Sequence, residues 1–257
     1  MEIGAQLYTV RDFLGNENEI RETFGKIKSI GYDNIQTGGA FNSVSYKKFR
    51  ELADEAGLEI CGSFDDFGLM YNNFEKAIER HKDLGVTIMG IGGHGTTVDG
   101  VWGYHSNKEV EDTLNKINII ADNIYPHGFR FMYHNHAHEF CRYGNKTILQ
   151  HFIDNTPEEK VLFCLDTFWT QVGGGDVRAY IKQLKDRIRI LHLKDFGKNN
   201  KGFFTAAIGD GNLNWDGIIE EAKESNVKYF VVEQDDCQGE NPFEALKRSR
   251  EYLEKFN

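Results

Sequence analysis

Three short hydrophobic runs in the second half of the chain each end on a residue that binds metal ions well. Residues 161–166, 188–192 and 229–233 end on Asp166, His192 and Glu233. Strands that stop on carboxylates and imidazoles place these groups at one rim of a sheet, where a buried charge is tolerated when it is paired or metal-bound. An oxygen-rich set with one or two imidazoles suits Mn, Mg, Co or Zn. The pattern predicts a metal-dependent enzyme that holds one divalent ion.

A fourth hydrophobic run, residues 129–133, leads into the densest group of such side chains in the chain: His134, Asn135, His136, His138 and Glu139. Side chains alternate along a strand, so His134 and His136 share one face. A metal ion needs at most one of these two imidazoles. We therefore expect His134 or His136 to move a proton in catalysis, and activity to rise through a histidine-like pKa near neutrality. Glu233 is the other candidate for this role.

Asp166 and Glu233 each have an alternative interpretation. An aspartate that follows a strand often caps the next helix, but here the helix is expected to start later, where Asp176 is the better cap. Glu233 precedes further acidic residues and would then begin a solvated loop. Because several ligand-type residues end strands in the same half of the chain, we favour ligand roles for both.

Lys194 follows His192 by two residues and shares its face of the seventh strand. A lysine that points into a barrel needs a reason. Binding a substrate oxygen, or polarising a carbonyl as a cation, supplies one. We expect Lys194 to contact substrate, whereas Asp195 faces away and pairs with a neighbour.

Short strand-like runs alternate with amphipathic helical patterns along the whole chain, which is typical of a parallel sheet built from βα units. The expected strands are residues 2–7, 34–36, 58–61, 87–91, 129–133, 161–166, 188–192 and 229–233. The expected helices are residues 17–29, 45–56, 72–84, 108–124, 145–153, 176–185, 215–225 and 242–256. A doubly wound open sheet would need a glycine fingerprint after the first strand, and none is present. The pattern predicts an α/β protein, a single (β/α)8 TIM barrel spanning residues 1–257.

The expected loops after strands four, five, seven and eight are long and rich in aromatic residues. In barrels of this type the loops that follow the strands build the active site. We therefore expect an aromatic wall around the site. The residues expected to bind substrate are Gln6, Tyr8, His94, Trp102, Trp169 and Lys194.

Composition narrows the classes of partner. The formal net charge of -10 argues against nucleic acid, which requires clustered Lys and Arg. The N-terminus has no basic start followed by an apolar stretch, and no run of apolar residues is long enough to span a membrane. The four cysteines are far apart and form no CxxC pair, which fits reduced thiols. We expect a soluble cytoplasmic protein, with a homo-oligomer left open.

The chain resembles the sugar phosphate isomerase/epimerase superfamily, the xylose isomerase-like TIM barrels that include inosose dehydratases and endonuclease IV. The resemblance covers essentially the whole length through QLYTVRD, YHNHAHEF, CLDTFW, LHLKDF, IGDGNLNW and VVEQDD. It implies one divalent cation held by a Glu, Asp, His, Glu set at the tips of strands five to eight. Asp166, His192 and Glu233 match the last three of these ligands.

The departures from the family pattern bear on the first ligand and on the substrate. Relatives commonly end the fifth strand on Glu, where this chain has His134, so either His134 substitutes or Glu139 reaches back from the loop. We expect Glu139 to be the ligand, because a second carboxylate offsets the charge of a divalent ion. The second strand ends on Gln36 where many relatives have Glu, and the third on Ser63 and Phe64 where many have His.

The resemblance and the residues together predict a divalent-metal-dependent isomerase or epimerase that abstracts a proton next to the carbonyl of a sugar or keto-sugar. The alternative is a metal-dependent lyase or dehydratase of the inosose or 3-keto-glycoside type, which shares the first step. An endonuclease IV-like nuclease is disfavoured by the acidic balance. A non-catalytic sugar-binding barrel would follow if the base were lost.

Overall fold

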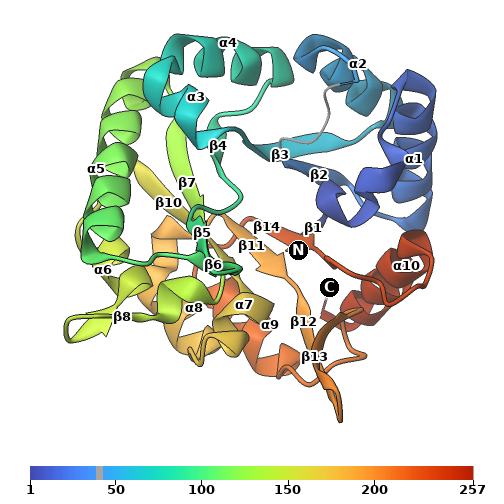
Figure 1. Ribbon diagram of the computed structural model, residues 1–257. Coiled ribbons are helices and arrows are strands. Elements are labelled where there is room, and N and C mark those ends of the chain that lie inside the picture. Colours follow the sequence, from blue (N-terminus) through green and yellow to red (C-terminus); the bar gives the residue numbers. More distant parts are fainter. Residues whose placement is uncertain (39–42, 257) are drawn as a thin grey trace.

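The computed structural model describes residues 1–38 and 43–256, and within them eight parallel strands close into a barrel (Figure 1). Around the barrel the strands run in the order β1, β14, β11, β10, β7, β4, β3, β2. Their bounds are β1 (Glu2–Gln6), β2 (Asn34–Gly38), β3 (Glu59–Phe64), β4 (Ile88–Ile91), β7 (Arg130–His134), β10 (Val161–Asp166), β11 (Ile190–Leu193) and β14 (Tyr229–Val232). The predicted (β/α)8 barrel is confirmed.

Helices surround the barrel, and most of them begin and end at residues suited to those positions. Asn16, Ser45 and Ser106 accept hydrogen bonds from backbone N–H groups of the first helical turn. Gly31 and Gly57 end two helices in the left-handed conformation, where a side chain is disfavoured. The helices are α1 (Glu17–Ile30), α2 (Tyr46–Ala56), α3 (Phe67–Asn72), α4 (Phe74–Leu84), α5 (Asn107–Ile124), α6 (Ile148–Asp154), α7 (Thr167–Val172), α8 (Val177–Leu184), α9 (Trp215–Glu224) and α10 (Pro242–Leu253).

Short 3-10 helices complete the connections: η1 (Leu7–Phe13), η2 (Tyr125–His127), η3 (His138–Phe140), η4 (Lys185–Arg187) and η5 (Glu254–Phe256). The helix predicted over residues 72–84 begins two residues later than expected, at Phe74. Asn73 separates it from α3, because its side chain accepts from Lys76 N and its backbone N–H closes α3 on Leu69 O. The short helix α7, directly after β10, was not predicted, and it matters for the site described below.

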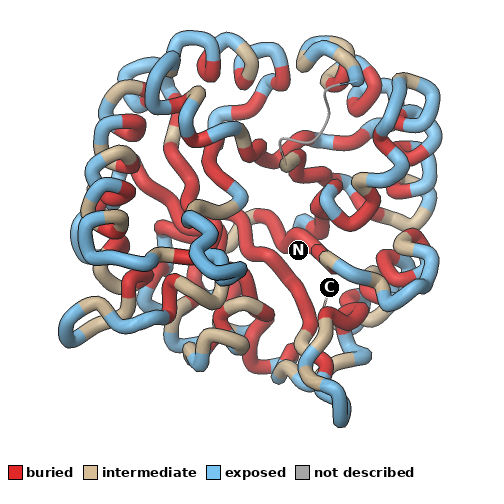
Figure 2. Tube along the Cα trace, in the orientation of Figure 1, coloured by how far each residue is buried: buried red, intermediate tan, exposed pale blue. Residues whose placement is uncertain are grey.

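Two apolar layers hold the barrel together, and Figure 2 shows the buried strands inside a ring of helices with exposed outer faces. The larger layer lies between the strands and the helices and includes Phe24, Phe131 and Tyr133. The smaller layer fills the barrel interior and includes Met132, Cys164 and Val231. Alternate residues of β7 therefore face different layers, so that His134 points into the barrel and Tyr133 points away from it.

Three hairpins extend the loops that follow β4, β7 and β11. They pair β5 (Thr96–Val98) with β6 (Val101–Gly103), β8 (Arg142–Tyr143) with β9 (Lys146–Thr147), and β12 (Asp195–Asn199) with β13 (Gly202–Ala206). Two of them carry exposed aromatic residues, Trp102 and Phe203. None of the described helices has both the length and the apolar character needed to cross a membrane.

Candidate metal centre

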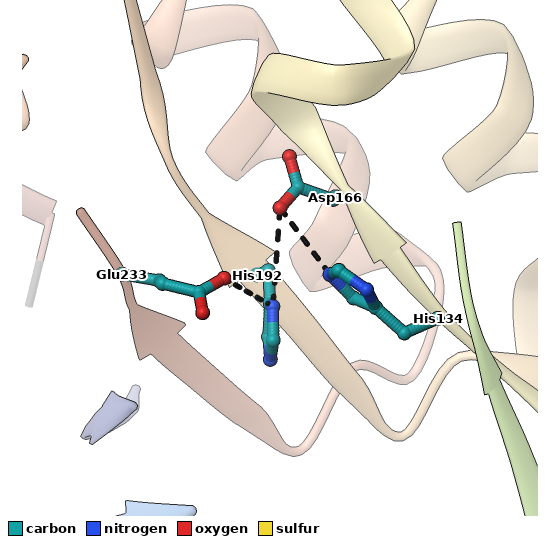
Figure 3. Close-up of side chains that lie close together, drawn as sticks. All are labelled: His134, Asp166, His192 and Glu233. Atoms are coloured by element: carbon teal, nitrogen blue, oxygen red, sulfur yellow. Dashed lines mark hydrogen bonds and ion pairs between the residues drawn. The ribbon is translucent and has the colours of Figure 1, made fainter. Parts of the chain in front are cut away.

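Four side chains from neighbouring strands converge at one end of the barrel: His134, Asp166, His192 and Glu233 (Figure 3). Each offers one ligand atom, and these atoms all lie within 4.8 Å of one another. His134 and Asp166 end β7 and β10, His192 lies in β11 opposite Asp166, and Glu233 directly follows β14. The parallel order of these strands brings together residues that are almost 100 positions apart in sequence.

Asp166 divides its two carboxylate oxygens between the fold and the site. Oδ1 accepts a hydrogen bond from the backbone N–H of Trp169 at 2.8 Å and so caps α7. Oδ2 faces the other way, 3.3 Å from His134 Nε2 and 3.9 Å from His192 Nδ1. The two interpretations of Asp166 are therefore compatible, because the unexpected helix α7 uses one oxygen and leaves the other for the site. Asp176 caps α8 separately.

His134 is held so that a lone pair faces Asp166. Its Nδ1 lies 3.1 Å from the carbonyl oxygen of Gly92, and because a carbonyl only accepts, Nδ1 carries the proton. In the neutral ring Nε2 is then an acceptor, and it faces Asp166 Oδ2, which is also an acceptor. Two acceptors held together in a buried site are what a shared cation stabilises.

His192 and Glu233 are a second pair of buried groups whose arrangement fits a shared cation. His192 Nδ1 lies 2.9 Å from Glu233 Oε2, yet neither buried atom has a hydrogen bond with good geometry among the described residues. Ligands that each lie about 2.1 Å from one metal ion are about 3 Å apart. Burial lowers the pKa of His192, but Cys164 and Glu233 raise it, to about 10 overall. A bound cation would take the place of that proton, since imidazole binds metals only in its neutral form.

The charges around the site also fit a divalent ion. Lys194 Nζ lies 2.8 Å from both Asp166 Oδ2 and Glu233 Oε2, and 3.1 Å from Asp235. Burial lowers the pKa of Lys194, but these three carboxylates together raise it well above its ordinary value. The Lys194 ammonium balances only one of the three carboxylate charges. Two negative charges therefore remain uncompensated when the imidazoles are neutral. The four converging side chains therefore fit a divalent cation in both charge and donor type.

Glu139 lies outside this group. Its fully buried carboxylate accepts from Tyr133 OH at 2.7 Å and from the backbone N–H of His136 at 2.8 Å, and lies 3.1 Å from His138 Nε2. Tyr133 points away from the barrel interior, and the turn of η3 carries Glu139 to the same side. The structure thus places His134, and not Glu139 as expected, beside Asp166, His192 and Glu233.

A cavity of about 670 Å³ opens beside the four converging side chains. Five of the six residues expected to bind substrate line it; the sixth, His94, does not. His94 instead packs on Phe67, with ring centres 4.6 Å apart, and lines a separate hollow of about 210 Å³. The lining includes Gln6, Tyr8, Phe64, Trp102, His134, His136, Trp169, Lys194, Glu233 and Asp235. Asp166 and His192 are fully buried behind this surface.

Comparison with known proteins assigns the chain to a family. The sequence profile of the xylose isomerase-like TIM barrel family matches residues 24–256. The chain belongs to this family. Among curated proteins, an inosose dehydratase from Clostridium perfringens is 24% identical over 283 residues, covering 95% of this chain and 92% of the relative. An inosose dehydratase from Mesomycoplasma hyopneumoniae is 24% identical over 272 residues, with 93% and 89% covered.

Solved structures of the family share the fold. A sugar phosphate isomerase/epimerase from Parabacteroides distasonis superimposes with a TM-score of 0.80 at 23% identity, covering 98% of this chain and 92% of that chain. A 3-keto-D-glucoside 4-epimerase from E. coli gives a TM-score of 0.71 at 16% identity, with 99% of both chains covered. At these identities the likeness shows the barrel alone.

Within this family barrel, His136 lies at the cavity wall. Its ring packs against Trp102 and Trp169, with centroid distances of 5.0 Å and 5.3 Å, and against His134 at 4.9 Å. Burial, followed by the neighbouring His134, lowers the pKa of His136 to about 3. His136 is therefore neutral at physiological pH. Its titration would not make the activity rise with pH near neutrality. Its buried Nδ1 has no hydrogen-bond partner among the described residues.

Two residues at the site were missed by the sequence reasoning. Asp235 binds Lys194 and lines the cavity. It lies two residues after Glu233, so the alternation of side chains was a signal that would have found it. Gln36 Oε1 lies 2.5 Å from His192 Nε2. No local pattern links these two residues, which are 156 positions apart.

Proposed function

We propose that this chain is a divalent-metal-dependent enzyme that removes a proton next to the carbonyl of a small keto-sugar or keto-polyol and then expels a β-hydroxyl as water. The observation that carries the proposal is the convergence of His134, Asp166, His192 and Glu233, two of whose buried atoms face each other without a hydrogen bond. These four residues would hold the metal ion. When bound, such an ion supplies a Lewis acid that polarises the substrate's carbonyl and hydroxyl oxygens.

The burial of the four residues suggests how the roles divide. Asp166 and His192 lie behind the cavity surface and would act only as ligands. Glu233 lines the cavity, and although burial raises its pKa, Lys194 and His192 lower it well below the ordinary value. Glu233 is thus ionised at neutral pH, which is the form a base requires. We assign it the transfer of the proton from carbon.

Lys194 would complete the reaction. Its ammonium lies against Glu233 and Asp235 and lines the cavity, within reach of a substrate oxygen. When the C–H bond next to the carbonyl breaks, its electron pair moves toward the carbonyl oxygen. In the second step this electron pair forms a carbon–carbon double bond, and the β C–O bond breaks. The departing oxygen takes a proton from Lys194 and leaves as water. His136, neutral and with Nδ1 free, would donate to or accept from a substrate hydroxyl.

The position of the ionisable groups favours elimination over epimerisation. Epimerisation by two bases needs proton-transfer groups on opposite sides of the reacting carbon. Here the strands β1, β2 and β3 contribute Gln6, Gly38 and Phe64 to the cavity wall, whereas Lys194, Glu233 and Asp235 follow the neighbouring strands β11 and β14. The acids near this wall are engaged elsewhere, since Asp65 binds Arg80 at 3.1 Å and Asp66 caps α3.

The names of the curated relatives point the same way, because those relatives are called inosose dehydratases. A cyclic keto-polyol would also suit a cavity walled by Trp102 and Trp169, whose rings pack on the apolar faces of such molecules. Isomerisation is the second candidate, because a single base on one side also suffices to move a proton between neighbouring carbons.

The experiment is to incubate the purified protein with inosose in D2O, with and without added Mn2+. We expect loss of one water from the substrate and deuterium in the remaining substrate pool, both abolished by a chelator and restored by metal. Deuterium exchange without loss of water would replace elimination by isomerisation. Neither exchange nor dehydration with inosose or with a panel of 3-keto-glycosides, in protein shown to contain metal, would remove the proposal.

A further inference from the structure

A row of hydrogen bonds crosses the barrel from β1 to the metal centre, and it starts at a backbone group of known polarity. The backbone N–H of Tyr8 donates to Gln6 Oε1 at 3.3 Å, because Gln6 caps the 3-10 helix η1. A backbone N–H can only donate, so the oxygen of the Gln6 amide must face Tyr8. The amide nitrogen of Gln6 then faces the opposite way.

The next bond passes from β1 to β2. Gln6 Nε2 donates to Gln36 Oε1 at 3.1 Å, and both side chains are buried, with 1% and 0% of their surface exposed. Since Gln6 must donate here, the oxygen of the Gln36 amide is the atom at this contact. The orientation of Gln36 is therefore set by Gln6 and cannot be reversed without losing a buried bond.

The last bond reaches β11. Gln36 Oε1 lies 2.5 Å from His192 Nε2, and because an amide oxygen only accepts, Nε2 must carry the proton. In the neutral imidazole the lone pair then belongs to Nδ1. That atom lies 2.9 Å from Glu233 Oε2 and 3.9 Å from Asp166 Oδ2, on the side of the proposed ion.

We propose that Gln36, oriented by Gln6, is a positioning residue that fixes the Nε2–H form of His192 and so directs its Nδ1 lone pair into the metal centre. The inference rests on the proposed metal-dependent function. It gives the two histidines opposite arrangements: His134 is fixed through Nδ1 by a backbone carbonyl, and His192 through Nε2 by a side chain that can be changed by mutation. Groups that orient a metal-binding histidine in this way typically affect metal affinity by about 10–100-fold.

The test is the affinity of the purified protein for Co2+ alone, measured by titration with the visible absorption of the bound ion as a second readout. Gln36→Leu keeps the approximate volume of the side chain and removes the acceptor. Gln36 Nε2 has no partner among the described residues, so the variant loses only the two bonds that Gln36 Oε1 accepts, from Gln6 and from His192. We expect Co2+ affinity to fall about 10–100-fold in this variant, with an altered absorption spectrum.

Three further variants separate positioning from general disturbance of β2. Gln36→Glu retains an acceptor for His192 and should restore affinity to the wild-type level or above. Gln6→Leu leaves Gln36 free to turn its amide over and should give a smaller loss than Gln36→Leu. Thr37→Val is the matched control, because the buried hydroxyl of this neighbouring residue has no partner in the described part of the chain. Its Co2+ affinity should equal that of wild type.

The position of the ring proton on His192 can also be measured directly, independently of the Co2+ titration. In Zn2+-loaded protein carrying 15N-labelled histidine, long-range proton–nitrogen spectra distinguish a ring protonated at Nε2 from one protonated at Nδ1. We expect a slowly exchanging Nε2 proton on His192 in wild type and in Gln36→Glu, and its loss in Gln36→Leu.

The outcomes are distinct. If Gln36→Leu binds Co2+ as tightly as wild type, the positioning role is wrong while the metal centre stands. If Gln36→Leu and Thr37→Val weaken binding equally, β2 is merely loosened and the role is also wrong. If the wild-type protein binds no Co2+, the proposed function fails and this inference fails with it.

Discussion

The rim of the barrel divides into two halves that carry different kinds of side chain. One half, from β7 to β14, carries His134, Asp166, His192 and Glu233 at or near its strand ends, and the other, from β1 to β3, carries Gln6, Gln36 and Phe64. The first half carries Lys194 among three carboxylates. The acids that follow β3 in the second half are engaged elsewhere, since Asp65 binds Arg80 and Asp66 caps α3. The second offers amides and an aromatic ring. We therefore expect the chemistry to be concentrated in the first half, and the second half to shape the cavity and, through Gln36, to orient His192.

Asp166→Asn should produce the largest effect in the charged half. An asparagine oxygen can still cap α7, so the fold should be kept. The loss of one negative ligand should remove the metal ion and lower turnover by more than about 100-fold. Elemental analysis of the purified variant, together with its thermal unfolding midpoint, checks both parts. Wild-type metal content would exclude Asp166 from the site.

Lys194→Met should separate catalysis from metal binding within the same half. The lysine touches three carboxylates but is no ligand, so removing its charge leaves the site more negative and metal retention unchanged or tighter. Turnover should fall about 100–10,000-fold, which is the usual contribution of a positioned acid. Kinetics and metal content on one preparation provide the measurement. Loss of metal with intact substrate affinity would reverse the assignment.

The sequence predicts the barrel and much of the charged half for a simple physical reason. Hydrophobic runs mark the strands, and a ligand at the end of a run needs no knowledge of distant residues to be placed at the rim. Asp166, His192 and Glu233 follow from this rule. The structure places each of them at the rim and in one group.

The remaining features depend on directions that only the folded chain decides. Glu139 and His134 are both near the end of β7, and the turn of η3 and the outward-facing Tyr133 determine which of them enters the barrel. His94 follows β4 and turns onto Phe67 outside the cavity. The hydrogen bond that His192 donates to Gln36 joins β11 to β2, which are not neighbouring strands, so it has no local signature.

Glu139→Gln should affect stability and leave the metal centre intact. Burial raises the pKa of Glu139 but His138 lowers it below its ordinary 4.5, and the pKa of His138 is raised above 6.5 by the same pair despite burial. The Glu139 carboxylate contributes to the free energy of unfolding fully above pH 4.5, and this contribution is lost as pH falls through its folded pKa. The His138 imidazole contributes fully below pH 6.5, and its contribution is lost as pH rises through its folded pKa. The deficit of the variant, about 3 kcal/mol, should therefore be largest between these two values.

Chemical denaturation at several pH values measures this deficit, and metal content serves as the control. A Glu139→Gln variant that loses its metal ion would return Glu139 to the ligand set in place of His134. A deficit that does not change with pH would mean that the Glu139–His138 pair is not ionised in the native protein.

Trp102→Ala should have the smallest effect, and it sharpens the contrast between the two halves. Trp102 lies on the hairpin after β4, the strand between the two halves, is 41% exposed, and packs on His136 and His138, which follow the neighbouring strand β7. It contacts neither the converging ligands nor Lys194 in the described structure, so metal content and turnover should stay close to wild type. An aromatic face against a sugar ring contributes about 1.4 kcal/mol, which corresponds to about tenfold in affinity. We therefore expect KM to rise about tenfold while kcat changes less than threefold, measured by steady-state kinetics on the substrate identified above. A large fall in kcat with unchanged KM would show that Trp102 acts through His136 on the chemical step, and that the chemistry also depends on a part of the rim outside the half from β7 to β14.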